Sequence, residues 1–438
     1  MNSNLYSWGR YPYYPQTGHG CAWRSELPLA FQSISEQFGE TLAYGNGRSY
    51  GDSCLAVSDQ VVMTGAMDRF IEADWATGRI VVEAGITLAQ ILAISIPKGW
   101  FLPITPGTQF VTVGGAIAND VHGKNHHRRG TFGNNIHTFG LLRSQEGQLT
   151  CSDQENSDLF AATIGGLGLT GIITSCTLNL IPISSNAIES TKIRFNNLRE
   201  FFQLSNELDC QHEYSVAWID CLAKGDNIGR GVFIVGDHAK YGQLRVSQQS
   251  KLNIPVTPPA SPFNRNTLNI FNSCYWHLQP AKKTNARINY EPFFYPLDGI
   301  LNWNRIYGSK GFQQFQCVIP EENAETTMRE LLKEIANAGT GSFLAVLKRC
   351  GDISSPGLIS FPLRGTSLAL DFPQKTNLES TLLRRLDDIV AASNGRLYPA
   401  KDAHMSAEHF RLFYPSWEKL EAQRDPALKS RFWNRVTL

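Results

Sequence analysis

The sequence has no excess of either charge. Forty Lys and Arg residues face 39 Asp and Glu residues, a formal net charge of +1 at pH 7. Proteins that bind nucleic acid through phosphate contacts usually carry a clear basic excess, so we expect no nucleic-acid partner. The sequence also lacks an apolar run near the roughly 18 residues of a membrane span, and MNSNLYSWGRYPYYPQ has no signal-peptide core. These absences predict a cytoplasmic protein and leave peripheral contact with the inner membrane surface open.

Residue sets typical of metal centres are lacking too. The nine cysteines are scattered and include no C-x-x-C pair. His122, His126, His127 and His137 fall close together, but no carboxylate triad or cysteine accompanies them. Because metal ligands must converge as a set, we expect no metal site.

What is present indicates a large globular chain of mixed structure. With 438 residues, 42% of them hydrophobic, two or three domains are expected. Short β-rich runs and a helix-like run fill residues 58–118, and the pattern pauses at 182–185. From 190 to 395 strand and helix patterns alternate as in α+β proteins, and the tail is helical in character. Residues 251–267, rich in Pro and Asn, predict a mobile surface loop.

Three glycine-rich segments suggest close approach of the backbone to a ligand. YGNGRSYGDS (44–53) is either a pyrophosphate-binding loop or a hairpin turn. In residues 105–138, VGGAIAND offers small residues to a flat cofactor, and HGKNHHRRG is an anion or flavin site or a solvated basic loop. GGLGLTG (165–171) matches G-x-G-x-x-G, but a strand-like sequel argues against a nicotinamide site.

Polar residues outside the glycine segments are ambiguous by themselves. Lys401 ends a late strand-like run, and Lys348 lies in FLAVLKRCG. Gln314 and Gln316 share one face of a strand and either hold a polyol or face solvent.

Three blocks, taken in order, resemble a known family. GNGRSYGD, TPGTQFVTVGGAIANDVHGKNHH and GRLYPAKD are similar to the vanillyl-alcohol-oxidase type of FAD-binding oxidoreductases. Within that group the chain is most similar to the decaprenylphosphoryl-β-D-ribose 2′-oxidases, over nearly its whole length. The HGKNHH and AKD blocks are specific, whereas the glycine loops are not.

The resemblance implies an α+β fold with an FAD-binding domain in two parts, residues 1–185 and 396–438. An antiparallel-sheet substrate domain, residues 186–395, is inserted between them. It also implies a set of FAD contacts: Gly45, Asn46, Gly47, Arg48, Ser49, Tyr50, Gly51, Asp52, Gly107, Thr112, Val113, Gly114, Gly115, Asn119, Asp120, Val121, His122, Ile172 and Tyr398.

The resemblance further implies how the cofactor and substrate are handled. Tyr50 stands where many relatives attach FAD to a histidine, so FAD should be bound noncovalently. Lys401 should act as base or as an electrostatic group, and Lys124 should supply a second cation or bind a substrate phosphate. Gln314, Gln316 and Lys348 match the family's sugar pocket. Ala369 replaces a cysteine of the mycobacterial enzyme, which leaves pocket shape and the identity of the sugar and lipid open.

The leading hypothesis is FAD-dependent oxidation of C2 of a pentose on a polyprenyl phosphate. A separate short-chain NAD(P)H reductase would complete an epimerisation in cell-envelope or polysaccharide biosynthesis. The alternatives are an oxidase or dehydrogenase of a soluble sugar or aldonolactone, and a flavin-binding protein without turnover. Residues 254–271 offer six apolar residues on an expected surface loop: Ile254, Val256, Phe263, Leu268, Ile270 and Phe271. This segment is either a membrane contact, a cover over the pocket or a flexible crossover between elements.

Overall fold

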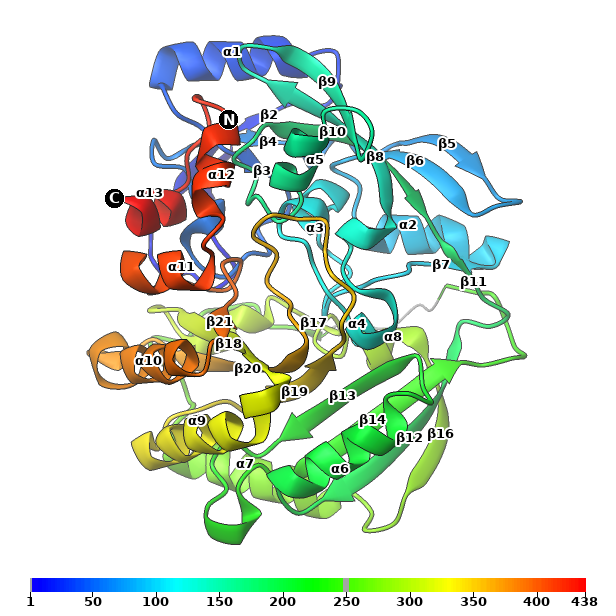
Figure 1. The fold of residues 1–438 in the computed structure, drawn as a ribbon, viewed down its shortest axis with the longest axis vertical. Coiled ribbons are helices and arrows are strands. Elements are labelled where there is room, and N and C mark those ends of the chain that lie inside the picture. The colour runs from blue at the N-terminus through cyan, green and yellow to red at the C-terminus, as the bar shows by residue number, and fades with distance from the viewer. Residues whose placement is uncertain (1, 247–251) are drawn as a thin grey trace.

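The computed structural model describes residues 2–246 and 252–438. The fold is α+β, as predicted, with helices packed on mainly antiparallel sheets. In Figure 1 the N-terminal segments (blue to cyan) and the C-terminal helices (red) occupy the upper half, and the middle of the chain (green to yellow) fills the lower half.

Two small sheets form the upper half. The first has the order β1 (Asn2–Leu5), β2 (Gln16–Gly20), β4 (Gln60–Met63), β3 (Ala43–Tyr44). The second is antiparallel, with the order β5 (Phe70–Asp74), β6 (Arg79–Glu83), β10 (Ile172–Asn179), β8 (Ile136–Arg143), β9 (Gly147–Ser152). β7 (Trp100–Phe101) and β11 (Ile181–Pro182) pair as a separate two-stranded antiparallel sheet.

Amphipathic helices cover these sheets. α1 (Leu27–Phe38) buries Phe31 and Ile34 against Val62 of β4. α2 (Leu88–Ser95) begins at a Thr87 capping box, and α3 (Val113–Ala118) begins at Thr112, whose hydroxyl accepts a bond from Gly115 N. α4 (His126–Arg129) and α5 (Ser157–Thr163) are short.

One antiparallel sheet of eight strands dominates the lower half. Its order is β16 (Thr284–Asn289), β12 (Ala187–Phe195), β14 (Gly231–His238), β13 (Tyr214–Ile219), β19 (Ala345–Cys350), β20 (Gly365–Pro373), β18 (Phe312–Pro320), β21 (Arg396–Leu397). The chain enters this sheet just after the predicted pause at 182–185. The second predicted boundary, after residue 395, falls just before β21, which still pairs with β18.

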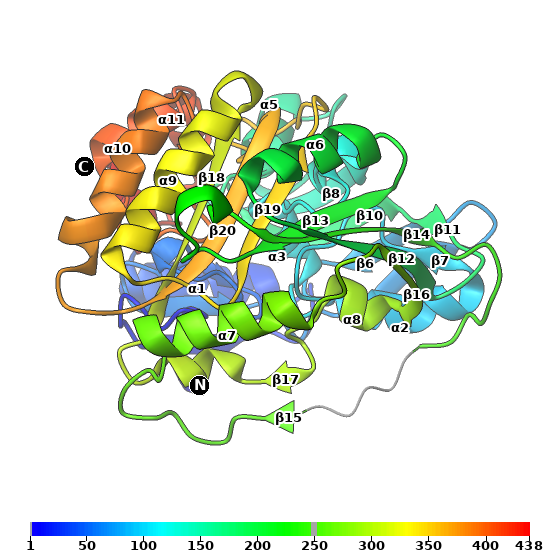
Figure 2. The same cartoon turned by 90° about the horizontal axis from the view of Figure 1, so that it is seen from below.

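Helices cover one face of this sheet and leave part of the other for the site. Figure 2 shows α6 (Leu198–Leu208), α9 (Ala324–Ala338) and α10 (Arg384–Ala392) together on one side, and α7 (Arg265–Leu278) and α8 (Tyr290–Phe294) on the other. On α9, buried Met328, Leu331, Leu332 and Ile335 follow helical periodicity, so one apolar stripe packs onto the sheet.

The C-terminal helices return to the upper half. α11 (Ala407–Phe413), α12 (Trp417–Gln423) and α13 (Arg431–Thr437) follow β21. Isolated bridges join Thr41 to Leu428 and Ala56 to Ser430, so the chain's end is hydrogen-bonded to its beginning.

The predicted mobile loop at 251–267 is only partly correct, and Lys251 lies outside the described residues. β15 (Leu252–Asn253) pairs with β17 (Ile300–Leu301), and α7 begins at Arg265 after an Asn264 capping box. The expectation that Leu268 is exposed was wrong, because Leu268 is 2% exposed and packs in the core.

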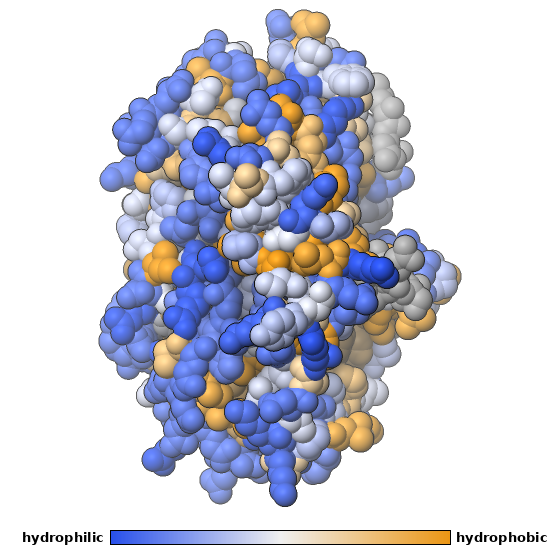
Figure 3. Space-filling view, turned by 90° about the vertical axis from the view of Figure 1, so that its right-hand side faces the viewer, coloured by the Kyte–Doolittle hydropathy of each residue, from blue (hydrophilic) through white to orange (hydrophobic). Residues whose placement is uncertain are grey.

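No helix within 2–246 or 252–438 has the length and apolarity needed to cross a bilayer. The face shown in Figure 3 is mostly hydrophilic, and its hydrophobic residues gather in small areas.

Candidate active site

A large cavity lies where the two halves meet. It encloses about 1900 Å³, including space open to solvent, and is lined by residues of both small sheets, of the large sheet and of the 398–401 turn. The three blocks that carried the family resemblance therefore converge on one space, although more than 300 residues separate the first from the last.

Most of the predicted site residues line this cavity. The lining includes Gly45, Asn46, Gly47, Arg48, Ser49, Tyr50, Gly107, Thr112, Gly114, Gly115, Asn119, Val121, His122, Gln314, Gln316, Lys348, Ala369, Tyr398 and Lys401. Six predicted residues are not among those that line it: Gly51, Asp52, Val113, Asp120, Lys124 and Ile172.

The carboxylate of Asp120 has a structural role. It accepts hydrogen bonds from Gly133 N (2.9 Å), Ser355 Oγ (2.5 Å) and Ser360 Oγ (2.5 Å). These protein donors use both carboxylate oxygens. Val113 and Ile172 are likewise core residues, each 0% exposed in an apolar cluster.

Lys124 is not among the residues that line the cavity. Its Nζ donates to Phe294 O at 3.2 Å and lies 5.7 Å from the centre of the Phe293 ring. The cation that lowers the Lys401 pKa is Lys348, so the expectation that Lys124 plays this part was wrong. Burial and the charge of Lys348 lower the pKa of Lys124 itself to about 7.

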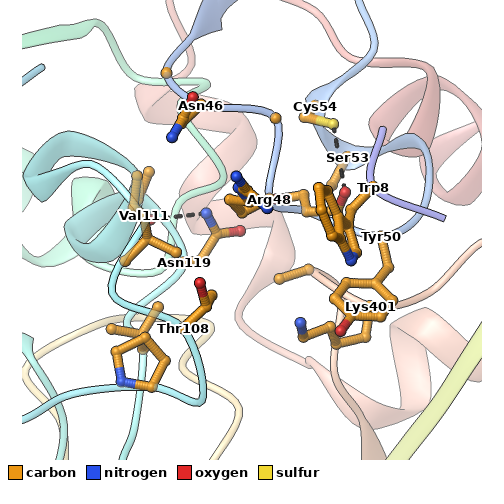
Figure 4. A pocket seen from close by; sticks show the side chains of 18 of the residues that line it. Trp8, Asn46, Arg48, Tyr50, Ser53, Cys54, Thr108, Val111, Asn119 and Lys401 are labelled. Carbon is orange, nitrogen blue, oxygen red and sulfur yellow. Dashed lines mark hydrogen bonds between the residues drawn. The ribbon is translucent and has the colours of Figure 1, made fainter. Parts of the chain in front are cut away.

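The first glycine loop is built to receive an anion. Among the described residues, the backbone N–H groups from Asn46 to Ser49 have no hydrogen-bond partner. Arg48 stacks on Trp8, 4.1 Å from the ring centre, and its Nε is buried without a partner, as is Ser53 Oγ. Figure 4 shows Arg48, Trp8 and Ser53 on the same side of the cavity. Buried donors that lack acceptors fit the pyrophosphate of FAD.

Glycines also shape the cavity for a flat group. A Cβ on Gly45 would lie 2.4 Å from Thr112 Oγ1, so only glycine lets this loop reach the start of α3. A Cβ at Gly107 or Gly168 would meet no atom within 4 Å, because both residues face the open cavity. The residues present therefore fit FAD along a wall that runs from the first loop to Gly168.

Lys401 lines the cavity beside Tyr50. Its Nζ is 3.5 Å from the centre of the Tyr50 ring, and Figure 4 shows the two side chains together. Burial lowers the Lys401 pKa to about 7, with nearby Lys348 adding to the effect and Asp371 opposing it. Burial also lowers the pKa of Lys348 to about 8 and raises that of Asp371 to about 6.

Three neighbouring strands present a row of side chains to the cavity. Gln316 of β18 and Val346 of β19 are both register partners of Ala369, and Lys348 pairs with Ser367. The prediction that Gln314 and Gln316 share a face was correct, and Phe315 points into the core. Gln314 Nε2 donates to Asp371 at 2.7 Å, and Gln316 Nε2 donates to His122 Nε2 at 3.2 Å.

Several basic residues of HGKNHHRRG anchor this segment to the turn that precedes β13. His127 Nε2 bonds to His212 O at 3.1 Å, Arg128 donates to Cys210 O, and Arg129 pairs with Glu213. Within the described ranges no three side chains of His, Cys, Asp or Glu come together as metal ligands would.

Sequence reasoning missed several lining residues. Trp8, Thr108, Asp298 and Trp303 all face the cavity. The aromatic density of the N-terminal segment was a signal for Trp8, but nothing in the pattern linked residue 8 to residue 303, although their rings lie 5.7 Å apart.

Comparisons with known proteins agree with this geometry. Residues 26–152 match the FAD binding domain family. The chain is 35% identical to decaprenylphosphoryl-β-D-ribose oxidase of Mycolicibacterium smegmatis over 399 residues, 88% of this chain and 86% of that protein. It is 31% identical to an uncharacterised protein of Streptomyces coelicolor over 78% of this chain and 96% of that one. A putative D-arabinono-1,4-lactone oxidase of Neurospora crassa is 30% identical over 40% of this chain and 31% of its own length.

Three findings indicate an FAD enzyme. One segment matches an FAD-binding family, the cavity holds donors that fit FAD, and an oxidase relative matches nearly the full length of the chain. The chain is an enzyme of the FAD-binding oxidoreductases, and it belongs to the family that includes decaprenylphosphoryl-β-D-ribose oxidase.

Proposed function

We propose that this enzyme oxidises the C2 hydroxyl of a pentose carried on a polyprenyl phosphate, giving a keto-sugar. The observation that carries the proposal is the grouping of Lys401, Lys348, Gln314 and Gln316 in the cavity that fits FAD. The relative from M. smegmatis, named for oxidation of a lipid-linked pentose, supports this substrate class.

In this proposal Lys401 takes the hydroxyl proton. Bound FAD supplies the acceptor for the hydride that leaves C2. With a pKa of about 7, a large share of Lys401 is the neutral amine at neutral pH, so it can act as a base. Gln314 and Gln316 orient the sugar hydroxyls, and Lys348, largely protonated at pH 7, supplies a positive charge for the substrate phosphate.

We further propose that residues 1–185 and 396–438 form the two parts of the FAD-binding domain around a substrate domain of residues 186–395. The bridges from Thr41 to Leu428 and from Ala56 to Ser430 support the pairing of the two ends. The keto-sugar needs a second enzyme that reduces it with inverted configuration, for which a short-chain NAD(P)H reductase is suited.

Trapping of the product tests the position of oxidation. After turnover of a polyprenyl-phosphoryl pentose, reduction with borodeuteride should place deuterium at C2 of the released sugar. Deuterium at another carbon, or none, would overturn the assignment of the C2 hydroxyl.

The pH dependence of turnover should report Lys401. Below the Lys401 pKa the amine is protonated and cannot accept a proton, so kcat/KM should rise with pH and level off above about 7. Lys348→Met removes a neighbouring positive charge, raises the Lys401 pKa and should shift the rise to higher pH. A kcat/KM that falls with pH across this range would show that the protonated lysine is the active form.

We expect FAD to be bound without a covalent bond. The segment from Gly45 to Ser53 holds no histidine, and burial raises the pKa of the Cys54 thiol to about 12, which keeps it protonated. Acid precipitation should therefore release the yellow colour into the supernatant. Colour retained in the pellet would indicate attachment, with His122, whose buried Nδ1 has no partner, as the first position to examine.

We also propose that the enzyme meets its substrate at a membrane surface through α7 and the strand before it. Residues 238–290 contain seven Lys and Arg residues and no Asp or Glu. Apolar side chains are exposed there, among them Val256 (69%), Ile270 (65%) and Leu278 (79%). β15 pairs with β17, two residues before cavity-lining Trp303, which places this surface near the cavity. Exposed apolar groups among positive charges suit an anionic bilayer.

The double variant Ile270→Ser, Leu278→Ser tests this surface, because the two residues lie two helical turns apart on the same exposed face of α7. Each of these side chains would contribute about 1.5–3 kcal/mol when inserted into the bilayer, so the loss of both should weaken binding to anionic vesicles about a hundredfold or more. Turnover of lipid-linked substrate should fall, and turnover of a short-chain analogue should not. Leu29→Ser, at a 73% exposed position on α1, serves as the control. Equal loss on both substrates would assign α7 to the pocket instead, and no loss on either would contradict the proposal.

A further inference from the structure

A buried cluster of charges lies directly behind the cavity wall. Arg435 of α13 donates to Asp52 through Nε (2.9 Å) and Nη2 (2.8 Å), and its Nη2 also lies 2.8 Å from Asp402 Oδ2. Asp52 and Asp402 are each 3% exposed. One guanidinium therefore joins two buried carboxylates that are 350 residues apart in the sequence.

Each of these two carboxylates follows a segment that lines the cavity. Asp52 follows the glycine loop that fits the FAD pyrophosphate, and Asp402 follows Lys401. The loop and the turn already touch, because Tyr50 N donates to Ala400 O at 3.0 Å. A Cβ on Gly51 would lie 1.6 Å from Asp402 O, so only glycine permits this contact.

His404 also holds the turn that carries Lys401 and Asp402. His404 Nε2 lies 3.2 Å from Asp387 of α10, and Nδ1 lies 3.4 Å from Asp402. The same Nδ1 is 3.2 Å from Gln313 Oε1 on β18, the strand whose neighbouring residues Gln314 and Gln316 face the cavity. The turn is thus held to the large sheet by His404 and to the first loop by Arg435.

We propose that Arg435 is a positioning residue that locks the FAD-binding loop and the Lys401 turn into one unit. The C-terminal helix α13 then controls FAD affinity and the placement of Lys401 together. The part that concerns Lys401 rests on the proposed function, whereas the part that concerns FAD does not.

Arginine is needed here for its shape as well as its charge. Its planar guanidinium presents several N–H groups in fixed directions and reaches both carboxylates at once, and Arg435 Nη1 also donates to Met405 O. A lysine keeps the positive charge but offers one compact ammonium group. Arg435→Lys should therefore loosen the connection without leaving the carboxylates unneutralised.

The test compares Arg435→Lys with Arg431→Lys. Arg431 is on the same helix, has a similar side-chain exposure (23% against 27%) and pairs with Asp59, away from the cavity. The measurements are the FAD dissociation constant, from flavin fluorescence, and the visible circular dichroism of the bound flavin. Arg435→Lys should weaken FAD binding about tenfold, the ratio that corresponds to one charged hydrogen bond, and change the dichroism. Arg431→Lys should change neither.

Asp52→Asn provides a second route to the same result. It breaks the link to the first loop while leaving the Arg435 pair with Asp402, so it should weaken FAD binding to a similar degree. The double variant Asp52→Asn, Arg435→Lys should be no weaker than the worse single variant, because both remove one connection. Wild-type FAD affinity and dichroism in both single variants, or equal losses in Arg431→Lys, would overturn the proposal. Because neither readout needs a sugar, this outcome is distinguishable from a wrong substrate assignment.

Discussion

Replacement of Lys401 by alanine is expected to leave FAD bound and to slow flavin reduction by substrate about 10²–10⁴-fold, the usual range for loss of a general base. The reason is that Lys401 is a cavity-lining amine with a pKa near 7, and it makes no salt bridge among the described residues. Because the proton moves in the transition state, kcat and kcat/KM should fall together. Stopped-flow absorbance of the flavin measures the effect.

Lys401→Arg separates the two roles open to this residue. Arginine keeps a positive charge near Tyr50 but cannot become a neutral base at neutral pH. If Lys401 is the base, Lys401→Arg should be as slow as Lys401→Ala; if its charge alone matters, Lys401→Arg should be substantially faster. Reduction of Lys401→Ala at the wild-type rate would remove Lys401 from the catalytic group altogether.

Gly51→Ala should be the most damaging single change in the first loop. The added Cβ would lie 1.6 Å from Asp402 O and 2.5 Å from its carbonyl carbon, and backbone cannot move aside as a flexible side chain does. We expect a loss of about 1–3 kcal/mol of stability, as for other overpacked sites, together with FAD binding weakened at least about tenfold. Thermal unfolding and FAD titration measure the two effects.

Gly20→Ala is the matched control for this change. A Cβ at Gly20 would meet no atom within 4 Å, so stability and FAD affinity should stay near the wild-type values. If Gly51→Ala also behaves like the wild-type protein, the close contact between the loop and the Lys401 turn is not maintained in solution.

The sequence was informative where a pattern is local or where a motif carries chemistry. Strand alternation predicted the shared face of Gln314 and Gln316, and the alternating strand and helix patterns of residues 190–395 predicted an α+β arrangement. The family resemblance assigned Tyr50 and Lys401 to one FAD site, although no local sequence pattern links the two residues. Composition was misleading at 251–267, where many Asn and Pro residues hid the Asn264 cap of α7.

The errors in the site share a physical cause. A short polar residue in a glycine-rich block has the pattern of a cofactor contact, but the fold brings Ser355 and Ser360 onto the carboxylate of Asp120. Of the two roles expected of Lys124, that of the cation beside Lys401 failed for a similar reason, because Phe294 O accepts a hydrogen bond from its ammonium and strand register brings Lys348 to the cavity. Long-range contacts of this kind set the role of each residue and leave no trace in the sequence nearby.

Anaerobic mixing of the purified enzyme with substrate, followed by flavin absorbance, tests the central claim most directly. A polyprenyl-phosphoryl pentose should bleach the yellow colour in a single turnover, and the free pentose or an aldonolactone should do so much more slowly. Bleaching by free sugar or aldonolactone at an equal or greater rate would contradict the lipid-linked substrate, and no bleaching by any of the three would contradict sugar oxidation itself.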